Sequence, residues 1–369
     1  MKLDQLQKEL RQKPKYFAPQ IRNINHGKYD IVHAYIPHLD VIQSIFKIYG
    51  IRLRARIPRG ELDLAVNDLE SMIHIGNLRS TYPLAYESNL AMSQYETIYK
   101  HFQYLLRHKS ADSKLIQRLL NLQKLIPANV DIVPGFEKGE RLMRVSQATF
   151  LARTSQSRGT AKGIELYGPE FKSPYADFDW DQTTKSILQV CDQRIANLKL
   201  PDYFQNFKHL RKSDLEIDQS ARNINKTWKS PRAILYTRSQ RSELLAMFIF
   251  SDNCNELNFL ERSLKHACRH ALASILLALE LYRFDHGHFP QRLSELSPPY
   301  LSQIPLDPYT KQEFVYRSTG QSFIAYSVGP NLSDDGGIEN WHDPMIHTQS
   351  NDYAIGTPDQ VPVKFWLSW

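Results

Sequence analysis

A stretch near the C-terminus, residues 329–343, gathers oxygen-bearing side chains where a strand-like run breaks, and it sets two carboxylates beside Gly336 and Gly337. Ca²⁺ takes about six to eight oxygen ligands, drawn from carboxylates, amides and main-chain carbonyls. Paired glycines let the backbone fold around such an ion, because they adopt positive φ without strain. The candidate ligands of this predicted calcium site are Asn331, Asp334, Asp335, Glu339 and Asp343. The alternative is a solvated acidic turn that needs the glycines only for its backbone shape.

A second group with metal-binding chemistry is the segment KHACRH, which places His266 and His270 one helical turn apart. Two imidazoles on one helical face can hold zinc. Cys268 faces elsewhere and the sequence offers no third ligand, so we favour polar-face histidines over a zinc site. Further along, His286 and His288 are expected to line a surface turn.

If this chain is an enzyme, its catalytic groups are expected to be acidic or histidine side chains gathered between helices. Glu140 and Arg141 in the segment GERL are interpreted as a buried ion pair that joins two helices, with a catalytic carboxylate of a hydrolase as the alternative. The chain contains no HExxH, GxSxG, P-loop or GxGxxG pattern. Convergence of Glu140, His266 and His270 in one pocket would favour an enzyme, whereas dispersal would favour a binding protein. Asp307, which precedes a proline, is expected to form an Asx turn.

An arginine cluster suggests contact with an anionic partner. Its members are Arg52, Arg54, Arg56 and Arg59. A nucleic-acid interface would also need Lys208, Arg211 and Lys212 on the same face. Helical geometry spreads the arginines over more than one face and no aromatic stacking platform accompanies them, so nucleic acid is not favoured. A protein partner is expected, with an acidic partner or anionic lipid headgroups as the charge match.

The elements that position these groups are mostly helical. Apolar residues recur at helical spacing. The predicted helices cover 41–57, 61–79, 83–108, 112–125, 138–154, 181–197, 203–225 and 255–285. Asp179 or Asp181 is expected to cap the helix that follows, and a Gly after Asp285-His286 should end the longest helix.

The character of the chain changes after this helix. Alternating patterns predict strands at 313–319 and 322–328, joined through Gly320-Gln321 in a II′ turn. The tail at 361–369 is apolar enough to form a further strand. The predicted fold class is therefore mainly α with a C-terminal α+β module. In it, a helical-hairpin or bundle domain precedes a long helix packed on a small antiparallel sheet.

Composition and charge support two folded units. The 369 residues are 42% hydrophobic and 23% charged, as expected for a globular protein. The net charge is +7, but residues 280–369 carry 11 acidic and 5 basic side chains, a balance of −6. We predict an all-α domain over 1–230, with a long loop at about 155–180, and a second unit over 231–369.

Three cysteines without a CxxC pair support neither a disulfide framework nor a zinc ribbon, and leave the redox compartment open. The N-terminus MKLDQLQKEL has no apolar core of a signal peptide. The longest apolar stretch, 271–282, is shorter than the roughly 20 residues that cross a bilayer. A soluble chain is expected.

A family resemblance covers about 280–343. The patterns Tyr-x4-Gly-x-Phe-Pro from Tyr282, Leu-Asp-Pro-Tyr from Leu306 and Tyr-Ser-x-Gly from Tyr326 follow one another in the order seen in type II secretion major pseudopilins. This segment resembles their globular part, and the resemblance implies a long helix, a strand hairpin and a calcium-binding loop. Pro-Asn-Leu at 330–332 stands where the family has Ala-Asp-Gly, so an amide replaces one expected carboxylate.

The rest of the chain resembles uncharacterised bacterial envelope proteins. They share R-x-R-x-R-x-x-x-G-E-x-x-x-A-x-x-D-L, matched from Arg52 to Leu69, and GERL, matched from Gly139 to Leu142. The resemblance implies an envelope location, with the cytoplasm as alternative, and brings no activity. A pseudopilin's processing motif and membrane helix are missing, so a fibre subunit is not expected. The resulting hypothesis is a non-enzymatic cell-envelope interaction protein. The alternatives are a hydrolase and a basic protein that binds nucleic acid or lipid headgroups.

Overall fold

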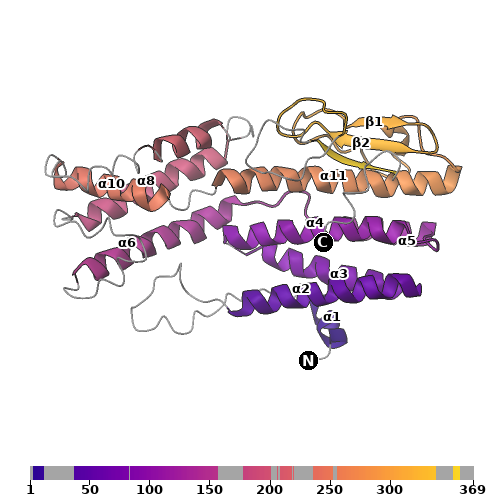
Figure 1. The fold of residues 1–369 in the computed structure, drawn as a ribbon, viewed down its shortest axis with the longest axis horizontal. Helices are drawn as coiled ribbons and strands as arrows, with labels where there is room; N and C mark the ends of the chain where they lie inside the picture. Colours follow the sequence, from indigo (N-terminus) through magenta and orange to yellow (C-terminus); the bar gives the residue numbers. More distant parts are fainter. Residues whose placement is uncertain are drawn as a thin grey trace.

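The computed structural model describes residues 3–11, 37–82, 84–156, 178–200, 206, 208–217, 219, 236–251, 256–337 and 352–357. Helices dominate these residues, and the described strands form one small antiparallel sheet near the C-terminus. The predicted fold class, mainly α with a C-terminal α+β module, is confirmed (Figure 1).

Nine α-helices have defined bounds within the described residues. They are α1 (Leu3–Arg11), α2 (Pro37–Arg56), α3 (Leu62–Ser80), α4 (Ala85–Leu106), α5 (Ser113–Gln123), α6 (Arg141–Gln156), α8 (Trp180–Leu198), α10 (Arg238–Ser251) and α11 (Glu256–His286). Short 3₁₀ turns lie at η2 (Ile57–Arg59) and η6 (Leu293–Leu296), and η3 (Gly135–Glu140) is a π-helix. Most predicted helices are confirmed, whereas α10 was not predicted as a helix of its own. The helix expected over 203–225 is described only in part, with 208–217 helical, and nearly all of the 155–180 loop lies outside the described residues.

The helices are arranged around α11, whose 31 residues span about 46 Å. On one side of α11 lie α4 and α5, followed by α3 and then α2, while the sheet covers the opposite side (Figure 1). At the other end of the molecule, α6, α8 and α10 pack together. None of the described helices combines the length and apolar character required to cross a membrane.

The sequence of α11 accounts for its central position, because apolar side chains point from it in two directions. Leu272, Leu276 and Leu279 lie in the core under the sheet. Leu277 and Leu281, which lie on a different side of α11, are in the core of the helical domain. Since α11 contributes to both cores, it joins the two predicted units, and the boundary at 230–231 stays a prediction.

The sheet has the order β1 (Val315–Ser318), β2 (Phe323–Ser327), β3 (Tyr353–Gly356), with both pairs antiparallel. Ser318 faces Phe323 across the hairpin and Gly320 has a φ of 84°, which fits the predicted two-residue turn. The strand β3 was not predicted, and the tail at 361–369 lies outside the described residues.

Local signals fix the helix ends as expected. The side chain of Asp179, rather than Asp181, caps α8 by accepting a hydrogen bond of 3.0 Å from the Gln182 N–H. Gly287 ends α11 with a φ of 77°, the left-handed conformation that other residues adopt only with strain. The described cysteines, Cys191 and Cys268, are buried thiols.

Two glycines with contrasting surroundings test how η3 packs on α4. A Cβ atom on Gly135 would lie 2.6 Å from the Ala85 backbone nitrogen, whereas one on Gly50 would meet Met72 Cε at an ordinary 3.5 Å. We expect Gly135→Ala to lower the free energy of unfolding by about 2 kcal/mol or more, because backbone has to move. Gly50→Ala, inside α2, should raise it by about 0.5–1 kcal/mol. Urea titration of both variants measures this, and equal stabilities would contradict the close contact.

Candidate functional site

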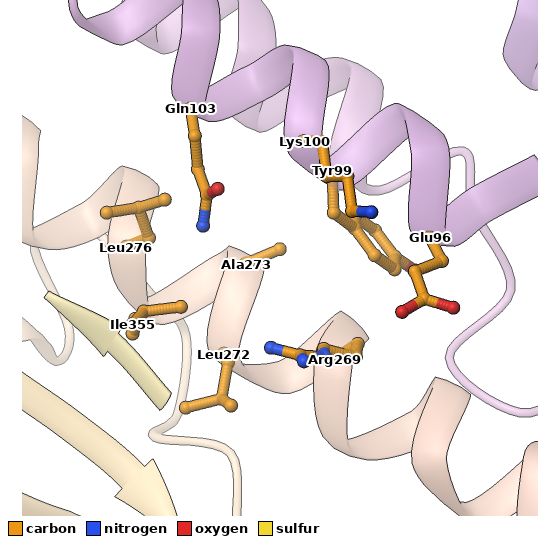
Figure 2. A pocket seen from close by; sticks show the side chains of 9 residues that line it. All are labelled: Glu96, Tyr99, Lys100, Gln103, Arg269, Leu272, Ala273, Leu276 and Ile355. Atoms are coloured by element: carbon orange, nitrogen blue, oxygen red, sulfur yellow. The ribbon is translucent and has the colours of Figure 1, made fainter. Parts of the chain in front are cut away.

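A small cleft lies where α4, α11 and β3 meet (Figure 2). The side chains around it are Glu96, Tyr99, Lys100, Gln103, Arg269, Leu272, Ala273, Leu276 and Ile355. Its cavity volume is about 20 Å³, which is room for about one water molecule. The cleft is therefore suited to a bound water rather than to an organic substrate.

Charged side chains at this cleft connect the three elements. Lys265 on α11 lies 3.4 Å from a Glu96 carboxylate oxygen on α4. Burial raises the pKa of Glu96, but Lys265 and Arg269 outweigh it, so the pKa is lower than usual. The same two cations lie 5.7 Å and 5.2 Å from the ring centre of Tyr353 in β3. Such cation–π contacts contribute about 0.5–2 kcal/mol each, so this group joins the sheet to the helices.

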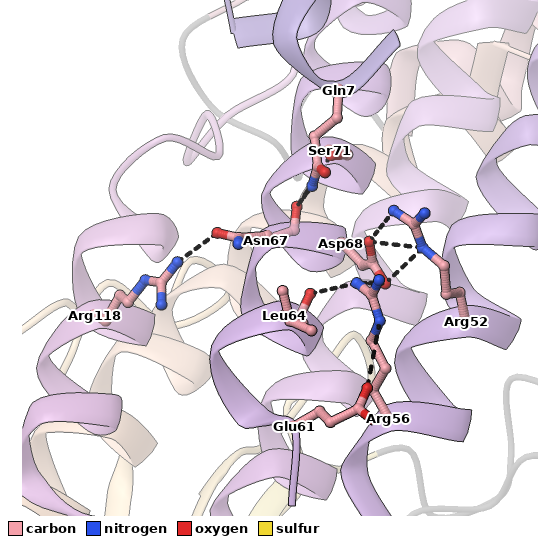
Figure 3. Close-up of polar contacts among 9 residues, drawn as sticks. All are labelled: Gln7, Arg52, Arg56, Glu61, Leu64, Asn67, Asp68, Ser71 and Arg118. Atoms are coloured by element: carbon pink, nitrogen blue, oxygen red, sulfur yellow. Dashed lines mark hydrogen bonds and ion pairs between the residues drawn. The ribbon is translucent and has the colours of Figure 1, made fainter. Parts of the chain in front are cut away.

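Two members of the arginine cluster, Arg52 and Arg56, make their contacts within the protein (Figure 3). Asp68 on α3 is fully buried, and Arg52 Nε donates to both of its carboxylate oxygens at 3.0 Å. Arg56 adds a contact of 2.7 Å to Asp68 and donates to the Leu64 carbonyl at 2.9 Å. Arg54 donates to the carbonyl of Gly50 within its own helix. Two of the four arginines thus join α2 to α3, which accounts for the spacing of the R-x-R-x-R…D pattern.

Glu140 lies beside buried charges, but not in the pair that the sequence suggested. Arg141 pairs with Asp192 at 3.0 Å. Glu140 instead shares a cavity of about 10 Å³ with Arg144 and Glu256. Burial raises the pKa of Glu140, with Arg144 opposing and Glu256 adding to the effect. The predicted buried Glu140–Arg141 pair is therefore wrong: Arg141 joins α6 to α8 through an exposed pair, with side chains 39% and 58% exposed.

The same cavity borders a cluster in which one arginine contacts two carboxylates. Arg194 on α8 is almost completely buried, and its Nη2 lies 2.6 Å from Glu256 and 2.7 Å from Asp214. The residues around this cavity sit next to η3, and π-helical turns often mark functional positions. Glu140, the last residue of η3, lines this cavity together with Arg194 of α8. With room for about one water at most, the cavity offers no space for a substrate.

His266 and His270 do share one helical face, and both rings serve as ties between elements. The Nε2 atoms lie 2.8 Å from the Pro127 carbonyl oxygen and 3.1 Å from that of Ile126. Carbonyl oxygens only accept, so each Nε2 carries the hydrogen and is unsuited to a metal in this state. His266 is buried against Tyr95, and burial lowers its pKa to about 4. The expected polar-face location is therefore wrong for His266.

The predicted calcium loop is described up to Gly337, so Glu339 and Asp343 lie outside the described residues. Asn331 donates its amide to Asp335 at 2.9 Å. Asp334 accepts from the Tyr326 hydroxyl at 2.8 Å and from the Gly336 N–H at 2.9 Å.

Those contacts leave a loop held in shape by its own polar groups. Among the described residues no group of three or more His, Cys, Asp and Glu side chains is already arranged around a common metal position. Asp307, as expected, forms an Asx turn by accepting from the Tyr309 N–H at 2.9 Å.

Asp352, just before β3, is the residue of this loop region that sequence reasoning missed. It is fully buried, and its Oδ2 accepts from the N–H groups of Asp335 at 3.1 Å and Gly337 at 2.7 Å. Its Oδ1 has no hydrogen-bond donor among the described residues. Burial raises the pKa of Asp352 to about 6, and the nearby Asp335 adds to that rise. A carboxylate oxygen of this kind belongs to the ligand class that Ca²⁺ uses.

The candidate sites are described from their geometry, because comparisons with known proteins identified no relative of this chain. Neither a scan against family models nor searches of curated proteins and of solved structures found a match to this chain.

The Asp68 contacts lead to a stability test. Asp68→Ala should lower the free energy of unfolding by about 3–5 kcal/mol, because it leaves two guanidinium groups without their buried partner. The matched control is Asp63→Ala on the same helix, whose side chain is 89% exposed and pairs with Arg118 at 2.8 Å. That exposed pair should cost no more than about 1 kcal/mol. Similar losses for both variants in urea titrations would contradict the assigned role of Asp68.

Proposed function

We propose that this chain is a non-enzymatic interaction protein of the cell envelope. Its helical domain presents a surface to a protein partner, and its C-terminal module is stabilised by one calcium ion. The envelope location rests on the resemblance of the sequence to envelope proteins and to pseudopilins. The binding role rests on an exposed apolar face of α2, and the calcium ion rests on Asp352.

The exposed face, which we name the α2 outer stripe, consists of Val41, Ile48 and Ile51. These side chains are 56%, 43% and 61% exposed, although the opposite side of α2 packs into the core through Tyr49 and Leu53. Spacings of seven and three residues place the three on one side of the helix. Single exposed apolar residues are ordinary on protein surfaces, but a row of them on one helix is a feature of interaction sites. This stripe is the observation that supports a binding function.

Charge indicates the kind of partner. Lys47 and Arg54 are exposed on α2 to one side of the stripe. An amphipathic helix with apolar anchors and an acidic flank would match both properties by packing its apolar face on the stripe, as one helix packs on another. The charge asymmetry of the chain, basic before residue 280, favours such an acidic partner over a second basic surface.

The locations of the chemically active groups favour binding over catalysis. Glu140 lies against Arg144 and Glu256, whereas His266 and His270 hold backbone carbonyls on the connection after α5. This dispersal is the arrangement that we associate with a binding protein rather than with a hydrolase.

Calcium would act on the loop by satisfying Asp352. The N–H groups of Asp335 and Gly337 already fix one oxygen of Asp352. The carboxylates of Asp334 and Asp335 lie in the same loop and would have to turn toward the ion to join Asp352 as ligands. An ion that binds the second oxygen of Asp352 would remove the cost of burying that charge. The loop would then be locked against the sheet.

Photo-crosslinking tests the binding surface. A photoreactive residue at Ile51, introduced into the chain in its native cells, should give one discrete adduct with another protein. The same residue at the exposed Lys185 of α8 should not. Adding Ile48→Glu should lower the adduct yield about tenfold, because burying an unpaired carboxylate costs more than about 1.4 kcal/mol. Equal adducts at both positions, or a yield unchanged by Ile48→Glu, would contradict the proposal.

Thermal unfolding with calcium or a chelator tests the loop. At 100 times its dissociation constant, calcium should stabilise the wild type by about 2.7 kcal/mol. The double variant Asp334→Ala/Asp335→Ala and the single variant Asp352→Asn should lose this effect. Asp181→Asn, an exposed aspartate in α8, should keep it. A calcium effect that survives in the loop variants, or none in the wild type, would leave the loop as an ordinary acidic turn.

The pKa of Asp352 adds a pH dependence. Its folded pKa of about 6 lies above the ordinary value of about 3.9, so the protonated form stabilises the fold. That contribution is complete below about pH 4 and is lost as the pH rises through 6. In the presence of a chelator, raising the pH from 5 to 7 should therefore lower the melting temperature of the wild type more than that of Asp352→Asn. Parallel curves for the two proteins would contradict a buried, ionising Asp352.

A further inference from the structure

The end of α11 holds a pair of exposed histidines whose ring nitrogens are in a defined state. His286 Nδ1 lies 3.0 Å from the carbonyl oxygen of Tyr282, and His288 Nδ1 lies 3.0 Å from that of Phe289. A carbonyl oxygen accepts but cannot donate, so each Nδ1 carries a hydrogen. In the neutral ring, each Nε2 then presents its lone pair. Metal-binding histidines have this arrangement, with Nδ1–H on a carbonyl and Nε2 toward the metal.

The rings of His286 and His288 both pack against Tyr282. The His286 ring stacks on Tyr282 with a centroid distance of 4.1 Å and an interplanar angle of 19°. The His288 ring meets Tyr282 edge-on at 5.9 Å. Tyr282 is itself held by a hydrogen bond of 3.0 Å from its hydroxyl to Glu295. Gly287, with its φ of 77°, turns the chain between the two histidines.

The separation of the rings fits one shared ion. The centroids of His286 and His288 are 6.2 Å apart. A ring nitrogen binds a transition metal at about 2.0–2.1 Å, and the ring centre lies about 1.1 Å further, so two rings on one ion have centroids up to about 6.4 Å apart. The observed distance falls inside this limit, so one ion can reach both rings when both Nε2 atoms turn toward it.

We propose that His286 and His288 together bind one divalent transition-metal ion through their Nε2 atoms. No third His, Cys, Asp or Glu among the described residues completes a ligand group with them, so water fills the remaining positions. Imidazole ligands bind Cu²⁺, Ni²⁺ and Zn²⁺, and among divalent first-row metals the general order of affinity places Cu²⁺ first. The site is separate from the predicted calcium loop in both ligand type and position, and its test does not depend on that loop.

Other histidines of the chain provide an internal contrast. His266 and His270 use Nε2 to donate to carbonyls, so their lone pairs are on the opposite nitrogen. His108 accepts a hydrogen bond at Nδ1 from the Ser110 N–H at 3.2 Å, so its Nε2 carries the hydrogen. His108 is therefore a matched control, a surface histidine held in the state that does not present Nε2.

Calorimetric titration with Cu²⁺ at pH 7.5, on the full chain, tests the proposal. The variants are His286→Phe and His288→Phe, which keep an aromatic ring on Tyr282 while removing the ligand, and His108→Phe as the control. Each single ligand variant should bind the tightest copper ion about tenfold more weakly or worse. Electron paramagnetic resonance should show two nitrogen ligands in the wild type and in His108→Phe, and one in each ligand variant.

Several outcomes would overturn the shared site. One is that both ligand variants keep the wild-type affinity, so that each histidine binds independently or neither binds. Another is that His108→Phe weakens binding as much as they do. The melting temperature of each variant, measured without metal, separates loss of a ligand from loss of the fold. The chain contains 13 histidines, so only differences between the variants and wild type are diagnostic.

Discussion

The burial of α11 on two sides is the constraint on which the arrangement of the whole chain depends. Its apolar rows face the sheet core in one direction and the helical core in the other, so neither core is complete without it. A helix that is apolar on two sides cannot remain exposed on either, because each exposed row would cost roughly 25 cal/mol per Å². The sheet and the helical layers are thus held in place by one element, because the core under the sheet is completed by the apolar side chains of α11.

Around this core, most of the ionisable side chains that the sequence analysis singled out hold elements of the fold together. Asp68 gathers Arg52 and Arg56, and His266 holds the connection between α5 and η3. Lys265 contacts both α4 and β3. These ties explain why the conspicuous motifs of the sequence do not converge on one reaction centre. The two metal sites that we propose lie elsewhere, at Asp352 beside β3 and at the histidine pair that ends α11.

Local signals were sufficient for much of the fold. Helical periodicity placed α3 and α11, the cap at Asp179 and the turn at Gly320 follow from short-range geometry, and Asp307 forms its turn within two residues. What sequence reasoning missed depends on distant contacts. The α10 helix packs on α8 and α6, which come earlier in the chain, and β3 pairs with β2. Asp352 joins the candidate site from 15 residues beyond Gly337, and nothing in the residues beside it indicates that contact.

The three-way contact of Arg194 has a consequence for the alignment of the helices along their axes. One guanidinium on α8 satisfies Glu256 at the start of α11 and Asp214 in the segment 208–217. Sliding α8 by a single turn, about 5.4 Å, would remove the positive charge from both carboxylates in a buried setting. Apolar contacts on α8 depend on the fit of shapes, whereas this contact also depends on the position of one charge. The charged trio therefore adds an electrostatic constraint on the axial position of α8 to the one that core packing already imposes.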